Sequence, residues 1–200
     1  MKVLVLDAMG VIYSVGDDVK DLLYPFIVEK GRTRDFTIVQ ENYHLASLGK
    51  ISAAEFWKTV EIAPKMENEY LQRFELTAGL LDFLKNIKSR GVEIWCLSND
   101  LSEWSNKLRI RFGLEKYIRG FVISGDVGLR KPDPMIYRIL LDRLNAKAND
   151  VIFIDDNPKN LDAASVIGFN TILFSPTVNT ALNEKHFKAA TFNEVMQFLD

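Results

Sequence analysis

Cysteine is nearly absent from this chain, because Cys96 is the single one among 200 residues. One cysteine cannot form an internal disulfide, and it cannot supply the thiolate cluster of a structural zinc site. A lone thiol fits a reducing compartment, so we expect a cytoplasmic location.

Long apolar runs are also lacking, as is an excess of charge of either sign. No stretch approaches the roughly 18 apolar residues that a membrane-spanning helix needs. Asp7 interrupts the apolar N-terminal segment too early for a signal peptide. Lys and Arg total 25 against 27 Asp and Glu, a net charge of −2, which gives no basis for binding nucleic acid or an anionic membrane. Hydrophobic residues make up 48% of the chain, enough to fill the core of a folded domain.

Short apolar runs alternate with helical patterns along most of the chain. Continuous apolar, β-branched runs of this length are typical of strands buried on both faces of a sheet. The expected strands are residues 2–6, 93–97, 121–123, 151–154 and 171–174, and the expected helices between them are 79–90, 102–112, 134–144 and one that ends at 167. This alternation predicts an α/β fold, a doubly wound parallel sheet with a Rossmann-like core.

Residues 14–77 break the alternation. Apolar residues recur there at helical spacing, and Ser52 followed by Glu55 has the pattern of a capping box. We therefore predict a small helical cap at 14–77, inserted between the two parts of the α/β core at 1–13 and 78–200. The alternative, that this stretch belongs to the main core, stays open.

Polar side chains follow the predicted strands or open the next helices at four places. They are Asp7, the pair Ser98–Asn99, Lys131, and the pair Asp155–Asp156 with Asn160 downstream. Each piece alone is typical of a turn, a loop or a helix cap. However, the carboxyl ends of parallel strands share one edge of the sheet, where such folds bind ligands. Three carboxylates gathered there would make an oxygen-only site of the kind that Mg²⁺ prefers.

In order and context, these pieces resemble the motifs of the haloacid dehalogenase-like hydrolase superfamily. The matching stretches are Val-Leu-Asp7-Ala-Met-Gly-Val, Cys-Leu-Ser98-Asn, Gly-Leu-Arg-Lys131-Pro-Asp-Pro-Met-Ile-Tyr137 and Phe-Ile-Asp155-Asp156-Asn-Pro-Lys-Asn160. Residues 48–57 are similar to caps in the branch that contains sugar-phosphate phosphatases and the amino-terminal domain of soluble epoxide hydrolases.

The resemblance implies a nucleophile and a metal site. Asp7 would take up the transferred phosphoryl group as an aspartyl phosphate. Mg²⁺ would sit on Asp7, the backbone carbonyl of Met9 and Asp156, with Asp155 ligating it directly or through water. The metal would neutralise phosphoryl charge and fix an in-line geometry.

The resemblance also implies residues that bind the substrate. Ser98 and the amide of Asn99 would bind the phosphoryl oxygens, and Lys131 would balance charge on the nucleophile and the phosphate. Asn160 would orient the ligands around the metal. The substrate would be a small phosphorylated metabolite.

Position 9 departs from the family pattern. Most phosphatases of the superfamily carry an acid/base Asp there, whereas this chain has Met9, and a thioether cannot transfer a proton. Loss of a general acid/base typically lowers the rate by about 10²–10⁴. In one reading another group supplies the proton, and His44 is a candidate because it lies three residues from Glu41 on one helix face.

Two other readings stay open. A metal-independent 2-haloacid dehalogenase would also lack the Asp at position 9, but Asp155 and Asp156 argue for a metal. Such an enzyme needs an arginine for the haloacid carboxylate, and Arg32 and Arg34 are the candidates in the insert. The third reading is a catalytically impaired protein that binds a phosphate ligand.

We therefore expect a Mg²⁺-dependent phosphatase whose cap closes over the site and excludes water. Tyr13, Phe36, Tyr43 and His44 are the candidates to line the substrate side. The oligomeric state stays open between a monomer and a homodimer.

Overall fold

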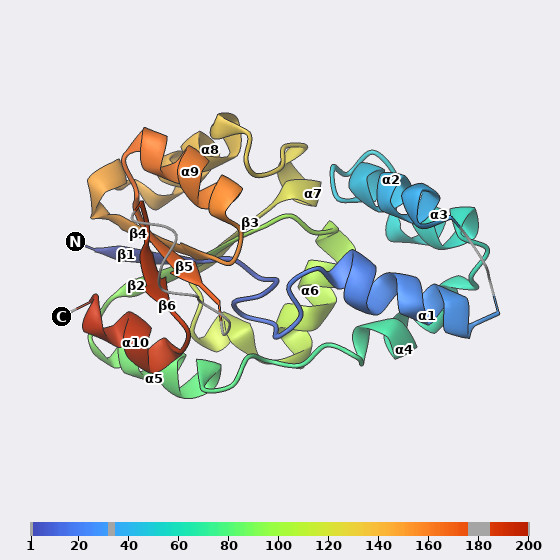
Figure 1. The fold of residues 1–200 in the computed structure, drawn as a ribbon, viewed down its shortest axis with the longest axis horizontal. Helices are drawn as coiled ribbons and strands as arrows, with labels where there is room; N and C mark the ends of the chain where they lie inside the picture. The colour runs from blue at the N-terminus through green and yellow to red at the C-terminus, as the bar shows by residue number, and fades with distance from the viewer. Residues whose placement is uncertain (1, 32–34, 176–184, 200) are drawn as a thin grey trace.

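The computed structural model describes residues 2–31, 35–175 and 185–199, in which six strands form one parallel sheet (Figure 1). The strands are β1 (Val3–Leu6), β2 (Glu93–Ser98), β3 (Gly120–Ile123), β4 (Val151–Asp155), β5 (Asn170–Phe174) and β6 (Phe187–Ala189). Their order is β3-β2-β1-β4-β5-β6, and every pairing is parallel. The chain winds from β1 outward in one direction and then in the other, so the predicted α/β fold class is confirmed.

Helices cover both faces of the sheet (Figure 1). They are α5 (Leu80–Ser89), α6 (Ser102–Arg111), α7 (Ser124–Val127), α8 (Pro134–Leu144), α9 (Pro158–Ile167) and α10 (Phe192–Gln197), with single 3₁₀ turns η3 (Leu114–Lys116) and η4 (Ala148–Asp150). Leu4 and Leu6 of β1 pack in one hydrophobic cluster with α5, α6 and α10, whereas Val3 and Val5 pack in a second cluster with α8 and α9. Successive side chains of a strand face opposite sides, so one apolar run fills both layers.

Between β1 and α5 the chain forms a helical segment, residues 14–77, which lies beyond one end of the sheet (Figure 1). Its elements are the π-helical turn η1 (Val19–Leu23), α1 (Tyr24–Glu29), α2 (Phe36–Ala46), α3 (Ala53–Thr59), the 3₁₀ turn η2 (Pro64–Met66) and α4 (Glu67–Leu71). The predicted capping box opens α3: Ser52 Oγ accepts from the Glu55 N–H, and Glu55 Oε2 accepts from the Ser52 N–H at 2.8 Å. Across the described ranges, no helix is both long and apolar enough to cross a membrane.

The helical segment shares its apolar core with one face of the sheet. Phe26, Trp57 and Tyr70 of the segment are fully buried and belong to the same cluster as Leu4 and Leu6 of β1. Burial of large aromatic side chains is a main source of folding free energy. The packing therefore runs across the predicted boundary, and the division into a core and a cap domain stays a prediction.

Glu67 of α4 adds a buried polar contact between the segment and α6. Its Oε2 accepts hydrogen bonds from the indole N–H groups of Trp57 and Trp104, each at 2.8 Å, and its Oε1 pairs with Lys107. Buried polar groups that are all paired specify one arrangement of the elements that carry them. This contact holds α3 and α4 against α6.

Candidate active site

Asp7 lies at the carboxyl end of β1, in the middle of the sheet. Leu6 pairs with Cys96 of β2 on one side and with Ile154 of β4 on the other, so the residues that follow these strands meet at one edge. Asp7 is 6% exposed, and its Oδ1 accepts from the Ala8 N–H at 2.6 Å. Within the described residues, its Oδ2 accepts no hydrogen bond. One oxygen is thus held in place and the other is left for chemistry.

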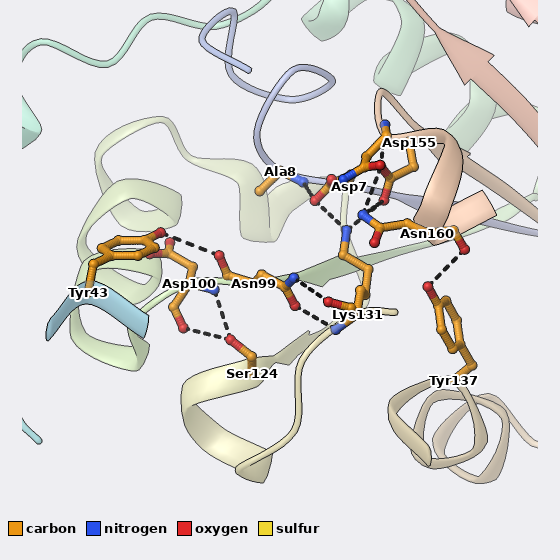
Figure 2. Close-up of polar contacts among 11 residues, drawn as sticks. Asp7, Ala8, Tyr43, Asn99, Asp100, Ser124, Lys131, Tyr137, Asp155 and Asn160 are labelled. Atoms are coloured by element: carbon orange, nitrogen blue, oxygen red, sulfur yellow. Dashed lines mark hydrogen bonds and ion pairs between the residues drawn. The ribbon is translucent and has the colours of Figure 1, made fainter. Parts of the chain in front are cut away.

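The Lys131 ammonium joins two of the strand-end carboxylates (Figure 2). Its Nζ lies 2.8 Å from Asp7 Oδ1 and 2.7 Å from Asp155 Oδ2, with its side chain 1% exposed. Burial lowers the pKa of Lys131, but the carboxylates of Asp155 and Asp7 outweigh it, and the net pKa is raised. Lys131 is therefore a permanent positive charge at the base of the site.

Asp155 is fixed from several sides. Its Oδ1 accepts from the Asn157 N–H at 2.8 Å, and Asn160 Nδ2 donates to Oδ1 at 3.1 Å and to Oδ2 at 3.0 Å. Asn160 is fixed in turn, because Tyr137 donates to its backbone carbonyl at 2.9 Å (Figure 2). Asn160 therefore lies beside the acids, where it orients Asp155.

Asp7, Asp155 and Asp156 form a cluster whose ligand atoms all lie within 4.8 Å of one another. Burial raises the pKa of Asp7, and the charge of Asp155 raises it further against the effect of Lys131. Burial and then Asp155 raise the pKa of Asp156 to about 6. Three crowded carboxylates repel one another, and a hard divalent cation relieves that repulsion. The donor set fits Mg²⁺.

Two glycines make room for Asp156. A Cβ added at Gly10 would lie 2.2 Å from Asp156 Oδ2, and one at Gly16 would lie 2.9 Å from the same atom. Gly10 also has a φ of +71°, which L side chains rarely adopt. The loop after β1 thus wraps closely around this carboxylate. Met9 lies in the same loop, is buried, and lines the cavity described below.

Ser98 and Asn99 follow β2, next to the carboxylates. Ser98 is 1% exposed and its Oγ has no hydrogen-bond partner among the described residues. An orphaned buried hydroxyl is ready to bind a ligand oxygen. The Asn99 side chain does a different job, because it accepts from the Lys131 N–H at 2.8 Å and donates to the Lys131 carbonyl at 2.9 Å (Figure 2). Of the two Asn99 amides, the backbone N–H is then the one available to an anion.

A cavity of about 940 Å³ opens over these groups. Asp7, Met9, Asn99 and Lys131 line it from the sheet edge together with residues 156–158 and Asn160, and residues 16–19, 40, 41 and 43–45 line it from the helical segment. Tyr43 and His44 therefore reach the cavity as the sequence predicts.

Tyr13 and Phe36 do not reach it. Tyr13 is buried with its ring centroid 5.5 Å from that of Phe74 and 5.8 Å from that of Phe112, so it belongs to the core and not to the substrate side. Phe36 packs against Tyr24 at 5.3 Å. Aromatic residues at helical spacing filled the interior here, as they do most often. The candidates Arg32 and Arg34 lie outside the described residues.

Asp18 and Arg130 line the cavity although sequence reasoning missed both as site residues. Asp18 is buried, and its Oδ2 accepts from the Tyr43 hydroxyl at 3.0 Å. Burial raises the pKa of Asp18 to about 7, and the Tyr43 hydrogen bond partly opposes the rise. The Arg130 guanidinium lies 5.9 Å from the centre of the Tyr43 ring. The doublet Asp17–Asp18 after Gly16 was the available signal in the sequence.

His44 and Glu41 both line the cavity, and both are exposed. Partial burial, followed by the charges of Arg130 and Lys50, lowers the pKa of His44 below its ordinary 6.5. The imidazole is therefore neutral near pH 7, which makes it a poor proton donor to a leaving group.

The family of haloacid dehalogenase-like hydrolases matches residues 1–168. Bifunctional epoxide hydrolase 2 of Sus scrofa is 32% identical over 57% of this chain, and ribulose-1,5-bisphosphate 5-phosphatase of Halopiger xanaduensis is 25% identical over 66%. (S)-2-haloacid dehalogenase 4A of Burkholderia cepacia is 33% identical over 44%. These matches span 21%, 55% and 38% of the relatives' own lengths, so the chain corresponds to part of each.

Solved structures share the fold at lower identity. A HAD phosphatase from Thermococcus onnurineus superposes with a TM-score of 0.76 at 16% identity, covering 100% of this chain and 98% of that one. A HAD family enzyme from Bacteroides thetaiotaomicron, in complex with magnesium and inorganic phosphate, gives a TM-score of 0.74 at 18% identity, covering 90% and 98%. With a family match over most of its length and this fold around the carboxylate cluster, the chain belongs to the haloacid dehalogenase-like hydrolases.

Proposed function

We propose that the protein is a Mg²⁺-dependent phosphatase of a small phosphorylated metabolite, working through an aspartyl phosphate on Asp7. The observation that carries this proposal is the cluster of three carboxylates with Lys131 bound to two of them at the base of a 940 Å³ cavity. A cation and clustered acids at one point are suited to a group that is itself highly charged.

Each residue at the sheet edge has a role in this proposal. Asp7, the backbone carbonyl of Met9, Asp155 and Asp156 hold Mg²⁺, which when bound neutralises charge on the phosphoryl oxygens. An oxygen of the Asp7 carboxylate attacks phosphorus in line with the bond to the leaving oxygen. The unpartnered Ser98 Oγ and the backbone N–H of Asn99 bind the phosphoryl oxygens.

Lys131 and Asn160 act on the carboxylates. The Lys131 charge favours the carboxylate form of Asp7 and so opposes the burial that favours its protonated form. Asn160 keeps Asp155 turned toward the cluster. The phosphatase from Halopiger xanaduensis and the magnesium and phosphate complex from Bacteroides thetaiotaomicron support the proposal by their likeness to this chain.

A metal-independent 2-haloacid dehalogenase is the competing function, because one relative carries that name. The cluster of Asp7, Asp155 and Asp156 argues against it. In an enzyme that works without a metal, these crowded acids would have Lys131 as the one cation that bridges them among the described residues. A cytoplasmic location, a lack of nucleic-acid partners and either oligomeric state stay predictions.

A panel of phosphate monoesters, assayed with Mg²⁺ and with a chelator, tests the proposal. We expect turnover that needs Mg²⁺ and that falls by at least about 10³-fold in Asp7→Asn, because the nucleophile is gone. Asp82→Asn is the matched control, since Asp82 is an exposed acid of α5 paired with Lys85. Halide release from 2-chloropropionate in the presence of a chelator would overturn the proposal in favour of a dehalogenase. Phosphate turnover that survives Asp7→Asn would remove Asp7 from the mechanism.

A further inference from the structure

Transfer of a phosphoryl group to Asp7 leaves a negative charge on the departing oxygen, which needs a proton when it belongs to an alcohol. In-line displacement puts that oxygen on the side of phosphorus opposite the nucleophile. Asp7 lies at the carboxyl ends of the strands, on the floor of the cavity. The departing oxygen therefore faces the opposite wall of the cavity, which the helical segment forms. Met9, two residues after the nucleophile, has no proton to transfer.

The described residues of that wall offer few acids. Asp17 and Glu41 are exposed, and His44 is exposed with a lowered pKa. The Tyr43 hydroxyl donates a hydrogen bond to Asp18. Asp18 is the buried carboxyl group among them, 6% exposed.

Asp17 and Asp18, the neighbouring acids at the start of η1, form different contacts. Asp17 Oδ1 accepts from the Lys20 N–H at 3.0 Å and so satisfies the start of the helix. Asp18 makes no such capping bond, although it is the residue before η1. Its side chain is directed to Tyr43 instead, at 3.0 Å. A carboxylate that serves the helix locally does not need burial, so the burial of Asp18 calls for another explanation.

Tyr43 connects Asp18 with the phosphoryl-binding loop. Its hydroxyl lies 3.0 Å from Asp18 Oδ2 and 3.4 Å from the backbone carbonyl of Asn99. In Figure 2 the Tyr43 ring reaches across to the loop of Asn99 and Asp100, which follows β2. Asp18 is thus held one side chain away from the loop that carries Ser98.

The surroundings keep Asp18 able to exchange a proton. Burial raises its pKa to about 7. The Tyr43 hydrogen bond and the Arg130 charge lower the pKa and the Asp17 charge raises it, while the neighbouring Asp100 has its own pKa raised by burial and by Asp18. A group that titrates near neutral pH serves well both as an acid and as a base.

We propose that Asp18 is the general acid and then the general base of the reaction; this rests on the proposed phosphatase function. As the bond between phosphorus and the leaving oxygen breaks, the Asp18 carboxylic acid gives that oxygen its proton, and an alcohol departs. The Asp18 carboxylate then takes a proton from the water whose oxygen attacks the phosphoryl group on Asp7. The bond from phosphorus to Asp7 breaks, inorganic phosphate leaves, and both aspartates return to their first state.

Asp18→Asn and the control Asp21→Asn, each compared with the wild-type protein, test this assignment. Asp21 is an exposed acid of η1 that does not line the cavity. Alkyl phosphates have leaving groups that need a proton, so we expect kcat for them to fall about 10²–10⁴-fold in Asp18→Asn. 2,4-Dinitrophenyl phosphate needs no proton in its first step, so Asp18→Asn should release one equivalent of dinitrophenol in a burst before slow turnover. Asp21→Asn should match the wild-type protein on both substrates.

Three results would overturn the assignment while the phosphatase function stands. They are wild-type rates in Asp18→Asn, an equal loss for alkyl and dinitrophenyl phosphates without a burst, and the same loss in Asp21→Asn. A wild-type protein that turns over neither substrate with Mg²⁺ would instead overturn the proposed function itself. Circular dichroism and thermal unfolding test whether each variant is folded. The burst is a further control, because it requires an intact Asp7 site.

Discussion

Gly10 shows how a missing side chain shapes the site. The carboxylate of Asp156 occupies the space where a Cβ would stand, with Oδ2 2.2 Å from that position. The positive φ of Gly10 keeps the loop turned toward Asp156. Among the described residues, no side-chain donor forms a hydrogen bond with the Asp156 carboxylate, and the close approach of the Gly10 backbone helps to hold it in place.

We predict that Gly10→Ala weakens Mg²⁺ binding by about 10–100-fold, the range for changes beside metal ligands. Isothermal titration with Mg²⁺ measures this. Gly91→Ala is the matched control, because Gly91 has a similar φ of +72° and nothing within 4 Å of its added Cβ. Both variants should lose about 1 kcal/mol of stability from the strained φ, but Gly91→Ala should bind Mg²⁺ normally. Equal Mg²⁺ affinity in the two variants would contradict the role given to Gly10.

Between elements, the buried Glu67 joins α4 to α3 and α6. The indole N–H groups of Trp57 and Trp104 both depend on it, and both tryptophans are fully buried. Loss of the acceptor would leave two buried donors without a partner, which is more costly than the loss of a surface ion pair.

Glu67→Ala should therefore lower the free energy of unfolding by about 2–4 kcal/mol. Urea denaturation, followed by tryptophan fluorescence, measures the change. Glu69→Ala provides the comparison: Glu69 lies on the same short helix, but it is exposed and pairs with Lys30 at the surface, so it should lose at most about 1 kcal/mol. If the two variants were equally stable, the buried contact would contribute nothing beyond packing.

The elements of the sheet were the most predictable part of the fold. The apolar run 151–154 forms β4 at Val151–Asp155, and the run 171–174 forms β5 at Asn170–Phe174. Buried parallel strands carry a strong signal, since both of their faces must be apolar. The strand β6 was missed because three residues are too few for a pattern, and its partner β5 lies earlier in the chain.

The residues of the candidate site also differed in how far the sequence could predict their position. Asp7, Asp155 and Asp156 could be predicted to meet because strand order and direction bring their ends together, and they do. The positions of Asp18 and Arg130 could not be predicted, because they depend on how the helical segment packs over the carboxyl ends of the strands. The sequence also could not show on which side the Tyr13 ring lies. The ring could have faced either the cavity or the core, and it packs against Phe74 in the core.

For the molecule as a whole, the crowded acids make stability depend on Mg²⁺ and on pH together. The pKa of Asp156 is raised to about 6, first by burial and then by Asp155. Above this pH the carboxylate is free to bind a metal, and below it a proton competes for the same oxygens. An ion that binds only the folded state stabilises it by RT ln(1 + [Mg²⁺]/Kd), so a weaker affinity gives a smaller stabilisation.

We therefore predict that Mg²⁺ raises the melting temperature near pH 7.5 and that the increase shrinks as the pH falls below about 6. Differential scanning fluorimetry with and without Mg²⁺ across this range provides the measurement. In Asp156→Asn the increase should be small at every pH. A Mg²⁺-induced increase as large at pH 5 as at pH 7.5 would show that Asp156 does not hold the ion.

The register of β1 also bears on synthesis. Val3 pairs with Glu93 on one side and with Val151 on the other, so during synthesis β1 waits for partners made about 90 and 150 residues later. Until then both of its edges are open to wrong pairing. A nascent chain that lacks β4 also lacks two of the three acids, so it would have no metal site. The carboxylate cluster would therefore form in a single step, once β4 and the residue after it are in place.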